Sequence, residues 1–358
     1  MHERINGLRE LMQCEGIDSF LVTSQENRFY FTGFTGSSGS VAITQKDIFL
    51  FTDFRYDEQA KIEAPHCQII MVKDALTDSL EDLVKEANLK KMGFEGDSVT
   101  YQQYNTLKEK LETVEIRPLP GVLDCLRSIK DDKEIDRVKK AVSLSDKAFE
   151  HILPFIKEGV SEREIALEIE FYMRKNGSEG VAFPTIVASG QRSSLPHGIA
   201  SQKKIARGDL VTLDFGAVLE WYNSDITRTI AVGEKNEEQQ KIYNIVLEAQ
   251  LSGISSVRPG IPASEVDRAA RKVIEDHGYG EFFGHSTGHG LGLKVHENPR
   301  LSAKDDTELK PGMIITVEPG IYLPGWGGVR IEDTVLVTGH GCSVLSAAPK
   351  ESLIVCDQ

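Results

Sequence analysis

The sequence predicts an α/β protein of two domains, the second of which contains an internal repeat. Its 358 residues exceed the usual size of a single domain. Helical and strand-like segments alternate over the first third of the chain, as in a mixed α/β (α+β) domain. In the remaining two thirds, two stretches share the same order of turn glycine, apolar strand and acidic residue, which indicates two copies of one unit related by a pseudo-two-fold.

The first domain is predicted from local patterns along the chain. Short apolar runs predict strands at residues 20–22, 48–51, 68–72 and 114–116. Helical patterns fall near residues 5–12, 55–64, 77–88 and 100–111. Prolines and a glycine at 118–121 then break the pattern, and a charged cluster follows at 130–133. We therefore place the domains at residues 1–125 and 130–358.

The second domain opens with helices whose boundaries are visible in the sequence. Residues 135–152 place apolar side chains on one face, which predicts an amphipathic helix. Ser161 and Glu164 form a capping-box signature for a second helix, which ends at Gly177. Residues 260–265 introduce a similar helix, which also ends at a glycine.

The repeat also places carboxylates at equivalent positions. Each copy has an acid six residues after its turn glycine, and these acids are Asp214 and Glu318. A second acid follows eleven residues later in the first copy, Asp225, and fourteen residues later in the second, Glu332. Acids at strand ends are often solvated or bonded to turns, but their repeat-related placement weighs against that explanation. If the copies pack face to face, the four acids converge, and two divalent cations would relieve their repulsion.

Histidines complete this pattern. His285, His289 and His296 fall within twelve residues and are interleaved with glycines, which can let the backbone approach a ligand closely. His197 lies on a separate turn-rich segment. A single imidazole with four carboxylates is an oxygen-rich site, which suits manganese, cobalt or iron(II) better than structural zinc.

Taken together, these motifs resemble the proline-specific pita-bread metallopeptidases of family M24, prolidase and aminopeptidase P. The resemblance covers nearly the whole chain, is strongest over 130–358, and is weaker at 27–34 and 52–56. It implies a creatinase-like N-terminal domain, a pita-bread C-terminal domain and two divalent metal ions, with Mn²⁺ expected first and Co²⁺, Zn²⁺ or Fe²⁺ as alternatives. The implied metal ligands are Asp214, Asp225, His289, Glu318 and Glu332.

The resemblance also implies roles for single residues. Asp225 and Glu332 would bridge the metals, Asp214 would complete one ion, and His289 and Glu318 would complete the other.

Catalytic roles follow in the same way. Glu318 would shuttle a proton to the leaving nitrogen, and His296 would bond the carbonyl or tetrahedral oxygen. His197 and His285 resemble substrate-pocket residues. Tyr322 and Arg330 would support the ligands. If residues 328–332 form a strand, Arg330 shares a face with Glu332 and can orient a ligand carboxylate.

The expected reaction is hydrolysis of the peptide bond before proline. Because that bond is a tertiary amide without an N–H, it requires a dedicated pocket. A dipeptidase must also recognise a free carboxylate, and Arg300 is the candidate cation, against the alternative of an ordinary surface arginine. We favour an Xaa-Pro dipeptidase over an Xaa-Pro aminopeptidase that cleaves longer peptides. A non-catalytic binding module on the same fold is the remote alternative.

Composition limits the partners and the compartment. The 41 basic and 55 acidic residues give a net charge of −14, which disfavours nucleic acid and anionic membranes as partners. No apolar run approaches the roughly 18 residues of a membrane span, and the first residues do not resemble a signal peptide. The five cysteines are widely spaced and are expected to be inert, partly buried thiols in a reducing cytoplasm. Proline-containing dipeptides or peptides are the expected substrates. The family resemblance also implies that the protein forms a homodimer.

Overall fold

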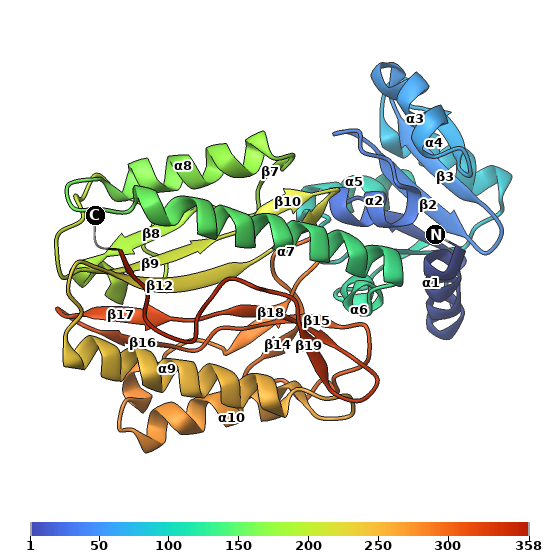
Figure 1. The fold of residues 1–358 in the computed structure, drawn as a ribbon. Coiled ribbons are helices and arrows are strands. Elements are labelled where there is room, and N and C mark those ends of the chain that lie inside the picture. The colour runs from blue at the N-terminus through green and yellow to red at the C-terminus, as the bar shows by residue number, and fades with distance from the viewer. Residues whose placement is uncertain (1, 357–358) are drawn as a thin grey trace. The chain divides into compact units, whose positions relative to one another are not determined.

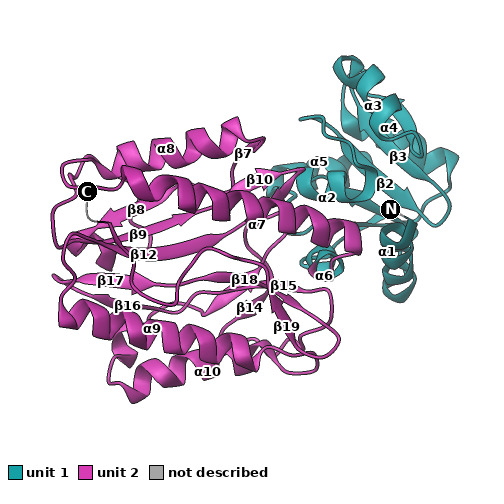
Figure 2. Ribbon diagram, in the orientation of Figure 1, with its two compact units in different colours: residues 1–127 teal, residues 128–358 magenta. Residues whose placement is uncertain are grey.

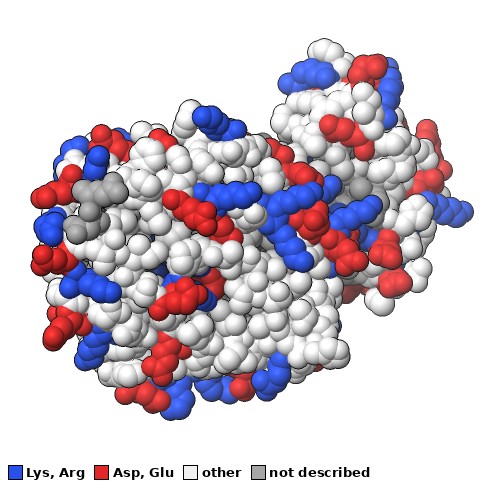
Figure 3. Space-filling model, in the orientation of Figure 1, with Lys and Arg blue, Asp and Glu red and all other residues white. Residues whose placement is uncertain are grey.

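The computed structural model describes residues 2–356 and divides into two compact units (Figures 1 and 2). Unit 1 ends at Arg127 and unit 2 begins at Ser128. Within the described residues, no helix combines the length and the apolar character needed to cross a membrane. On the face shown in Figure 3, acidic and basic side chains are interspersed.

Unit 1 is built on one mixed sheet of six strands in the order β4-β3-β2-β1-β5-β6. The strands are β1 (Ser19–Val22), β2 (Ser40–Thr44), β3 (Ile48–Thr52), β4 (Gln68–Met71), β5 (Lys91–Phe94) and β6 (Glu115–Pro118). The helices are α1 (His2–Glu15), α2 (Gln25–Thr32), α3 (Asp57–Glu63), α4 (Leu76–Glu86), α5 (Tyr101–Lys110) and α6 (Val122–Ser128), with the 3₁₀ turn η1 (Phe54–Tyr56). Strands β1, β2 and β3 pair antiparallel, whereas the pairs β1–β5, β5–β6 and β3–β4 are parallel. The mixed sheet expected from the sequence is confirmed.

The sequence patterns found some of these elements and missed others. The four predicted strands and four predicted helices all form, with boundaries shifted by a few residues. Strands β2 and β5 and helices α2 and α6 were not predicted. Strand β5 is only four residues long and includes Lys91 and Gly93, so its pairing with β1 and β6, rather than its own pattern, makes it a strand.

Unit 2 consists of two halves in which a pair of helices covers a sheet (Figure 1). The first half contains α7 (Asp132–Ile152), α8 (Glu162–Lys175), β7 (Gly180–Val181), β8 (Ile186–Ser189), β9 (Leu210–Phe215), β10 (Ala217–Leu219), β11 (Tyr222–Asn223) and β12 (Ile226–Val232), with 3₁₀ turns η2 (Leu153–Phe155) and η3 (Gly190–Ser194). The second half contains α9 (Glu237–Ser256), α10 (Ala263–Asp276), β13 (Gly288–Gly290), β14 (Glu297–Leu301), β15 (Ile314–Val317), β16 (Gly320–Leu323), β17 (Gly327–Arg330), β18 (Asp333–Val337) and β19 (Cys342–Val344), with η4 (Gly280–Phe282). The late strand β20 (Val355–Cys356) returns to the first half, where it pairs with β12. The main sheets have the orders β20-β12-β9-β8 and β14-β13-β15-β18-β19.

Equivalent helices begin and end at the predicted places. Helix α8 has the expected capping box, because Ser161 accepts the Glu164 backbone N–H and Glu164 accepts the Ser161 backbone N–H. Helix α10 begins after Pro262 without a side-chain cap. Both helices are followed by a left-handed glycine, Gly177 with φ 103° and Gly278 with φ 81°. The internal repeat read from the sequence is therefore present as two similar helix–sheet layers.

Each half has its own apolar core. In the first half, Phe149 and Ile152 of α7 and Ile169 of α8 pack on Val211 and Leu213 of β9. In the second half, apolar residues of α9 and α10 cover β15, β17 and β18. Burial of these side chains fixes the strands, so the polar residues at the strand ends are held on a rigid frame.

The cysteine prediction is partly wrong. Cys14 and Cys125 are exposed, whereas Cys67, Cys342 and Cys356 are partly buried as expected. Burial raises the pKa of the Cys67 thiol to about 12, which keeps it protonated and unreactive.

Candidate metal centre

Four acids of unit 2 lie at strand ends and face the interior. Asp214 is near the end of β9, and Asp225 immediately precedes β12. Glu318 directly follows β15, and Glu332 directly precedes β18. His289 occupies the middle of β13 and is buried. The five residues therefore come from five strand positions in the two halves.

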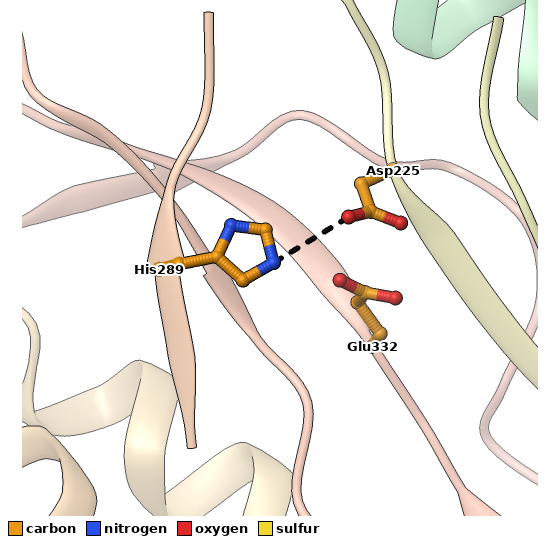
Figure 4. Close-up of side chains that lie close together, drawn as sticks. All are labelled: Asp225, His289 and Glu332. Atoms are coloured by element: carbon orange, nitrogen blue, oxygen red, sulfur yellow. Dashed lines mark ion pairs between the residues drawn. The ribbon is translucent and has the colours of Figure 1, made fainter. Parts of the chain in front are cut away.

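Three of these side chains meet closely. The ligand atoms of Asp225, His289 and Glu332 lie within 4.8 Å of one another (Figure 4). His289 Nε2 lies 3.5 Å from Asp225 Oδ2 and 3.4 Å from Glu318 Oε1. His289 Nδ1 is 3.0 Å from the Gly290 carbonyl oxygen, which can only accept, so Nδ1 carries the proton and Nε2 is free to bind a cation.

The glycines on either side of His289 allow neighbouring strands to approach closely. A Cβ at Gly288 would lie 2.0 Å from the Thr316 carbonyl oxygen, and one at Gly290 would lie 2.3 Å from the Asn298 carbonyl oxygen. Neighbouring backbone, rather than a ligand, therefore occupies the space beside these two glycines. This close approach of β13 and β15 brings His289 next to Glu318.

The acids are too crowded to ionise together without a compensating charge. Burial, with repulsion from neighbouring carboxylates, raises the pKa values of Asp225 and Glu332 well above their ordinary range, and burial raises that of Glu318 to about 7. Glu332 Oε2 accepts the Thr227 hydroxyl at 2.7 Å, but the buried Glu332 Oε1 has no hydrogen-bond partner. An unpaired carboxylate oxygen beside other acids fits a site for divalent cations.

The carboxylate of Asp214 is bonded to an arginine side chain. Arg330 Nη2 donates to Asp214 Oδ2 at 2.6 Å, Nε donates to Thr227 Oγ1 at 3.1 Å, and Nη1 donates to Tyr322 OH at 2.8 Å. Burial raises the pKa of Asp214, and the Arg330 guanidinium opposes that rise. The condition under which Arg330 and Glu332 would share a strand face is not met, because β17 ends at Arg330. The two residues are instead connected through the Thr227 hydroxyl, which bonds both.

His285 has a defined hydrogen-bonding state. Its Nδ1 lies 2.8 Å from the Ser286 carbonyl oxygen, so Nδ1 carries the proton. Burial lowers the pKa of His285 to about 4, so the ring is neutral at pH 7 and Nε2 accepts from Tyr322 OH at 2.8 Å. The Tyr322 hydroxyl therefore donates to His285 while it accepts from Arg330.

The other predicted residues lie around this group. The rings of His289 and His296 are 4.3 Å apart and nearly perpendicular. His197 is exposed.

Arg300 is also exposed, and it stands opposite His289 in the register of β13 and β14. Its charge lowers the pKa values of His289 and His296, after the larger effect of burial.

Two threonines of the site were missed by the sequence analysis. Thr227 bonds both Glu332 and Arg330, and Thr316 Oγ1 lies 3.4 Å from Glu318 Oε1 while accepting the His289 backbone N–H. Threonine is common in strands, so nothing in the sequence separates these two from other strand residues. Their roles depend on pairing between strands that are far apart in the chain.

Both units match known protein families. Residues 136–339 match the metallopeptidase family M24, and residues 4–129 match the creatinase/prolidase N-terminal domain. The chain is similar to the solved Xaa-Pro dipeptidase from Bacillus anthracis (50% identity, TM-score 0.96, 99% of each chain covered). It is also 44% identical to the Xaa-Pro dipeptidase of Pyrococcus furiosus over 99% of this chain and 100% of that protein. The solved X-Pro aminopeptidase from Thermotoga maritima shares 40% identity, with a TM-score of 0.90, over 95% of this chain and 98% of that one.

The matched segments span both units, and the M24 segment, residues 136–339, contains the acid and histidine cluster. The chain therefore belongs to metallopeptidase family M24, with a creatinase/prolidase N-terminal domain ahead of its peptidase domain.

Proposed function

We propose that this peptidase uses two divalent cations to hydrolyse the bond before proline and acts as an Xaa-Pro dipeptidase, or prolidase. The observation that carries the proposal is the group of buried acids around one histidine, in which Glu332 Oε1 has no protein partner. The full-length similarity to proteins named Xaa-Pro dipeptidase supports the choice of substrate.

The proposed ligand set is Asp214, Asp225, His289, Glu318 and Glu332. Of these residues, Asp225, His289 and Glu332 already lie close enough together to share a cation. Manganese is the proposed metal, with cobalt, zinc or iron(II) as alternatives, because oxygen ligands predominate. Bound cations of this kind acidify a water molecule and polarise the scissile carbonyl.

The protein's own groups would then bind substrate and move protons. Glu318, held by Thr316 next to His289, would accept a proton from the attacking water and deliver it to the proline nitrogen. His296, whose ring is beside that of His289, would donate to the developing oxyanion. His197 and His285 would line the substrate pocket.

Tyr322 and Arg330 are proposed to support the ligands. The arginine would hold Asp214 in its orientation, and the tyrosine would fix the arginine and His285 relative to one another.

Arg300 is proposed to bind the free carboxylate of a dipeptide. A guanidinium can bind that group through two parallel hydrogen bonds. The second candidate function is an Xaa-Pro aminopeptidase, which the similarity to the Thermotoga maritima enzyme supports.

Hydrolysis of Ala-Pro and Ala-Pro-Ala separates these functions. The purified protein is assayed with manganese, with cobalt and after chelation. Metal-dependent cleavage of Ala-Pro, with little cleavage of the tripeptide, is the result expected for a dipeptidase. Preference for the tripeptide would establish the aminopeptidase instead, and activity on neither would contradict proline specificity.

The compartment and the assembly are also proposals. We propose a cytoplasmic enzyme, because the cysteine spacing has no disulfide framework. A homodimer is proposed on the family resemblance and is tested by light scattering of the purified protein.

A further inference from the structure

Two histidine-bearing loops of unit 2 are held by the same arrangement of side chains. In each half, a buried acid on the second helix accepts bonds from a serine or threonine at the edge of the loop. The same acid pairs with an arginine, and that arginine donates to a carbonyl oxygen within the loop. The two arrangements differ in the origin of the arginine, which lies within the loop in the first half and on the helix in the second.

In the first half the acid is Glu162, the first residue of α8, whose side chain is fully buried. Its Oε1 accepts the Ser189 backbone N–H at 2.8 Å and the Ser189 hydroxyl at 2.9 Å. Its Oε2 accepts the Ser201 backbone N–H at 3.1 Å, the Ser201 hydroxyl at 2.6 Å and Arg192 Nε at 3.0 Å. Glu162 thus joins the two ends of the segment 189–201.

Arg192 extends this bonding to the middle of the loop. Its Nη2 donates to the Ile199 carbonyl oxygen at 2.7 Å. The Ile199 backbone N–H in turn donates to the His197 carbonyl oxygen at 2.9 Å. The main chain around His197 is therefore fixed from the α8 side, although His197 itself is exposed.

In the second half the acid is Asp267 of α10, with a side chain 1% exposed. Its Oδ1 accepts the Thr287 backbone N–H at 3.2 Å and the Thr287 hydroxyl at 2.8 Å. Arg271, one turn further along the helix, binds both carboxylate oxygens, at 2.9 Å and 3.0 Å. A two-bond pair of this kind gives orientation as well as attraction.

Arg271 reaches the loop through two carbonyl groups. Its Nη1 donates to the Phe283 carbonyl oxygen and its Nη2 to the His285 carbonyl oxygen, both at 2.8 Å. The guanidinium also stacks 4.2 Å from the centre of the Phe283 ring, and that ring meets the His285 ring edge-on at 5.0 Å. Both the main chain and the ring of His285 are therefore held in place by Arg271.

We infer that these two clamps, Glu162–Arg192 and Asp267–Arg271, position His197 and His285 respectively for the substrate. The four clamp residues act through the histidines and are positioning residues. The inference rests on the proposed function, because the two histidines are assigned there to the substrate pocket.

Double-mutant cycles on kcat/KM for Ala-Pro test this inference. Arg271→Gln is expected to lower kcat/KM about tenfold, because small misplacements of a pocket residue are costly. It is expected to have no further effect when His285 is already Ala, but to add fully to His197→Ala. Arg192→Gln is expected to show the reverse pattern, coupled to His197 and additive with His285.

Conservative variants and controls complete the test. Arg271→Lys and Arg192→Lys keep the positive charge but lose the planar guanidinium that donates several hydrogen bonds at once. Each Lys variant should therefore have a higher kcat/KM than the corresponding Gln variant and a lower one than the native protein. The control Lys272→Gln, which breaks an exposed ion pair with Asp276 on the same helix, should leave kcat/KM unchanged. Lys204→Gln, which breaks an exposed pair with Glu164, is the control for α8. Equal coupling of either arginine to both histidines, or full additivity with both, would overturn the inference.

Amide hydrogen exchange supplies a measurement that needs no substrate. Arg271→Gln should increase exchange in peptides that cover 283–290 but not in those that cover 189–201, and Arg192→Gln should do the opposite. If the native protein does not cleave Ala-Pro, the proposed function fails while this exchange pattern still tests the clamps. Unchanged exchange in both segments would show that the clamps do not hold the loops.

Discussion

Arg330 and Asp214 form a buried ion pair, with Nη2 2.6 Å from Oδ2, and both other nitrogens of the guanidinium are also bonded. The pair joins β17 of one half to β9 of the other. One carboxylate oxygen of Asp214 is therefore oriented by the protein. Outer partners of this type usually matter nearly as much as the ligands themselves.

Replacing Arg330 by Lys should lower kcat/KM for Ala-Pro by about 10- to 100-fold. Lysine keeps the charge but cannot bond Asp214, Thr227 and Tyr322 simultaneously in a fixed plane. Steady-state kinetics at saturating manganese measure the effect. The matched control is Arg268→Lys on the exposed face of α10, where the native arginine pairs with Glu265. A kcat/KM for Arg330→Lys equal to that of the native protein would rule out the orienting role.

Replacing Glu332 by Gln should weaken cation binding, because it removes the negative charge of a proposed ligand. Native protein should gain about 2.7 kcal/mol from a cation present at 100 times its Kd. The variant should gain much less at the same concentration, as measured by thermal unfolding with and without manganese. Glu150→Gln, at an exposed position on α7, should behave like the native protein. A native-sized manganese shift in Glu332→Gln would contradict the assignment of Glu332 as a ligand.

The metal-free protein should be more stable at pH 5 than at pH 8. The folded-state pKa of Glu318 is raised from 4.5 to about 7. The folded-state pKa values of Asp225 and Glu332 are raised well above their ordinary values. An acid with a raised pKa contributes stability fully below its unfolded value, and this stability is lost as pH rises through the folded value. For Glu318 the loss falls between about pH 4.5 and 7.

Denaturant unfolding of chelated and manganese-loaded protein at several pH values checks this expectation. Manganese should remove most of the loss at high pH, because the cations compensate the ionised acids and bind them better when they are deprotonated. Metal-free protein whose free energy of unfolding rises from pH 5 to pH 8 would contradict the proposed crowding of buried acids.

Replacing Arg300 by Gln should raise KM for Ala-Pro by about 10- to 100-fold, the range expected for a lost bond to a charged group. The effect on Ala-Pro-Ala should be smaller, because its free carboxylate lies one residue further along the peptide. Lys304→Gln, at a nearby exposed position, serves as control. Equal KM values for native protein and Arg300→Gln with Ala-Pro would favour the ordinary surface role of this arginine.

The candidate site was predicted from the repeat-related placement of its acids. Asp214 and Glu318 follow turn glycines at equal distances, and the repeat makes that spacing visible without a structure. Thr227 and Thr316 were not predictable, because a strand threonine gains its role only from a partner on another strand. Asp267 and Arg271 were not predicted for the same reason, because their partners lie on other segments. In the sequence they resemble ordinary polar residues of an amphipathic helix.

The sequence by itself determined the α/β class, the repeat and the chemical identity of the acids and histidines, because these depend on local spacing and residue type. Only the tertiary structure decided which atoms meet: that Asp225, His289 and Glu332 converge within 4.8 Å, while Asp214 turns to Arg330. It also decided that His285 is a neutral acceptor for Tyr322, since burial and the Ser286 carbonyl fix its tautomer. Pairing between distant strands sets these contacts, and no local pattern in the chain encodes their distances.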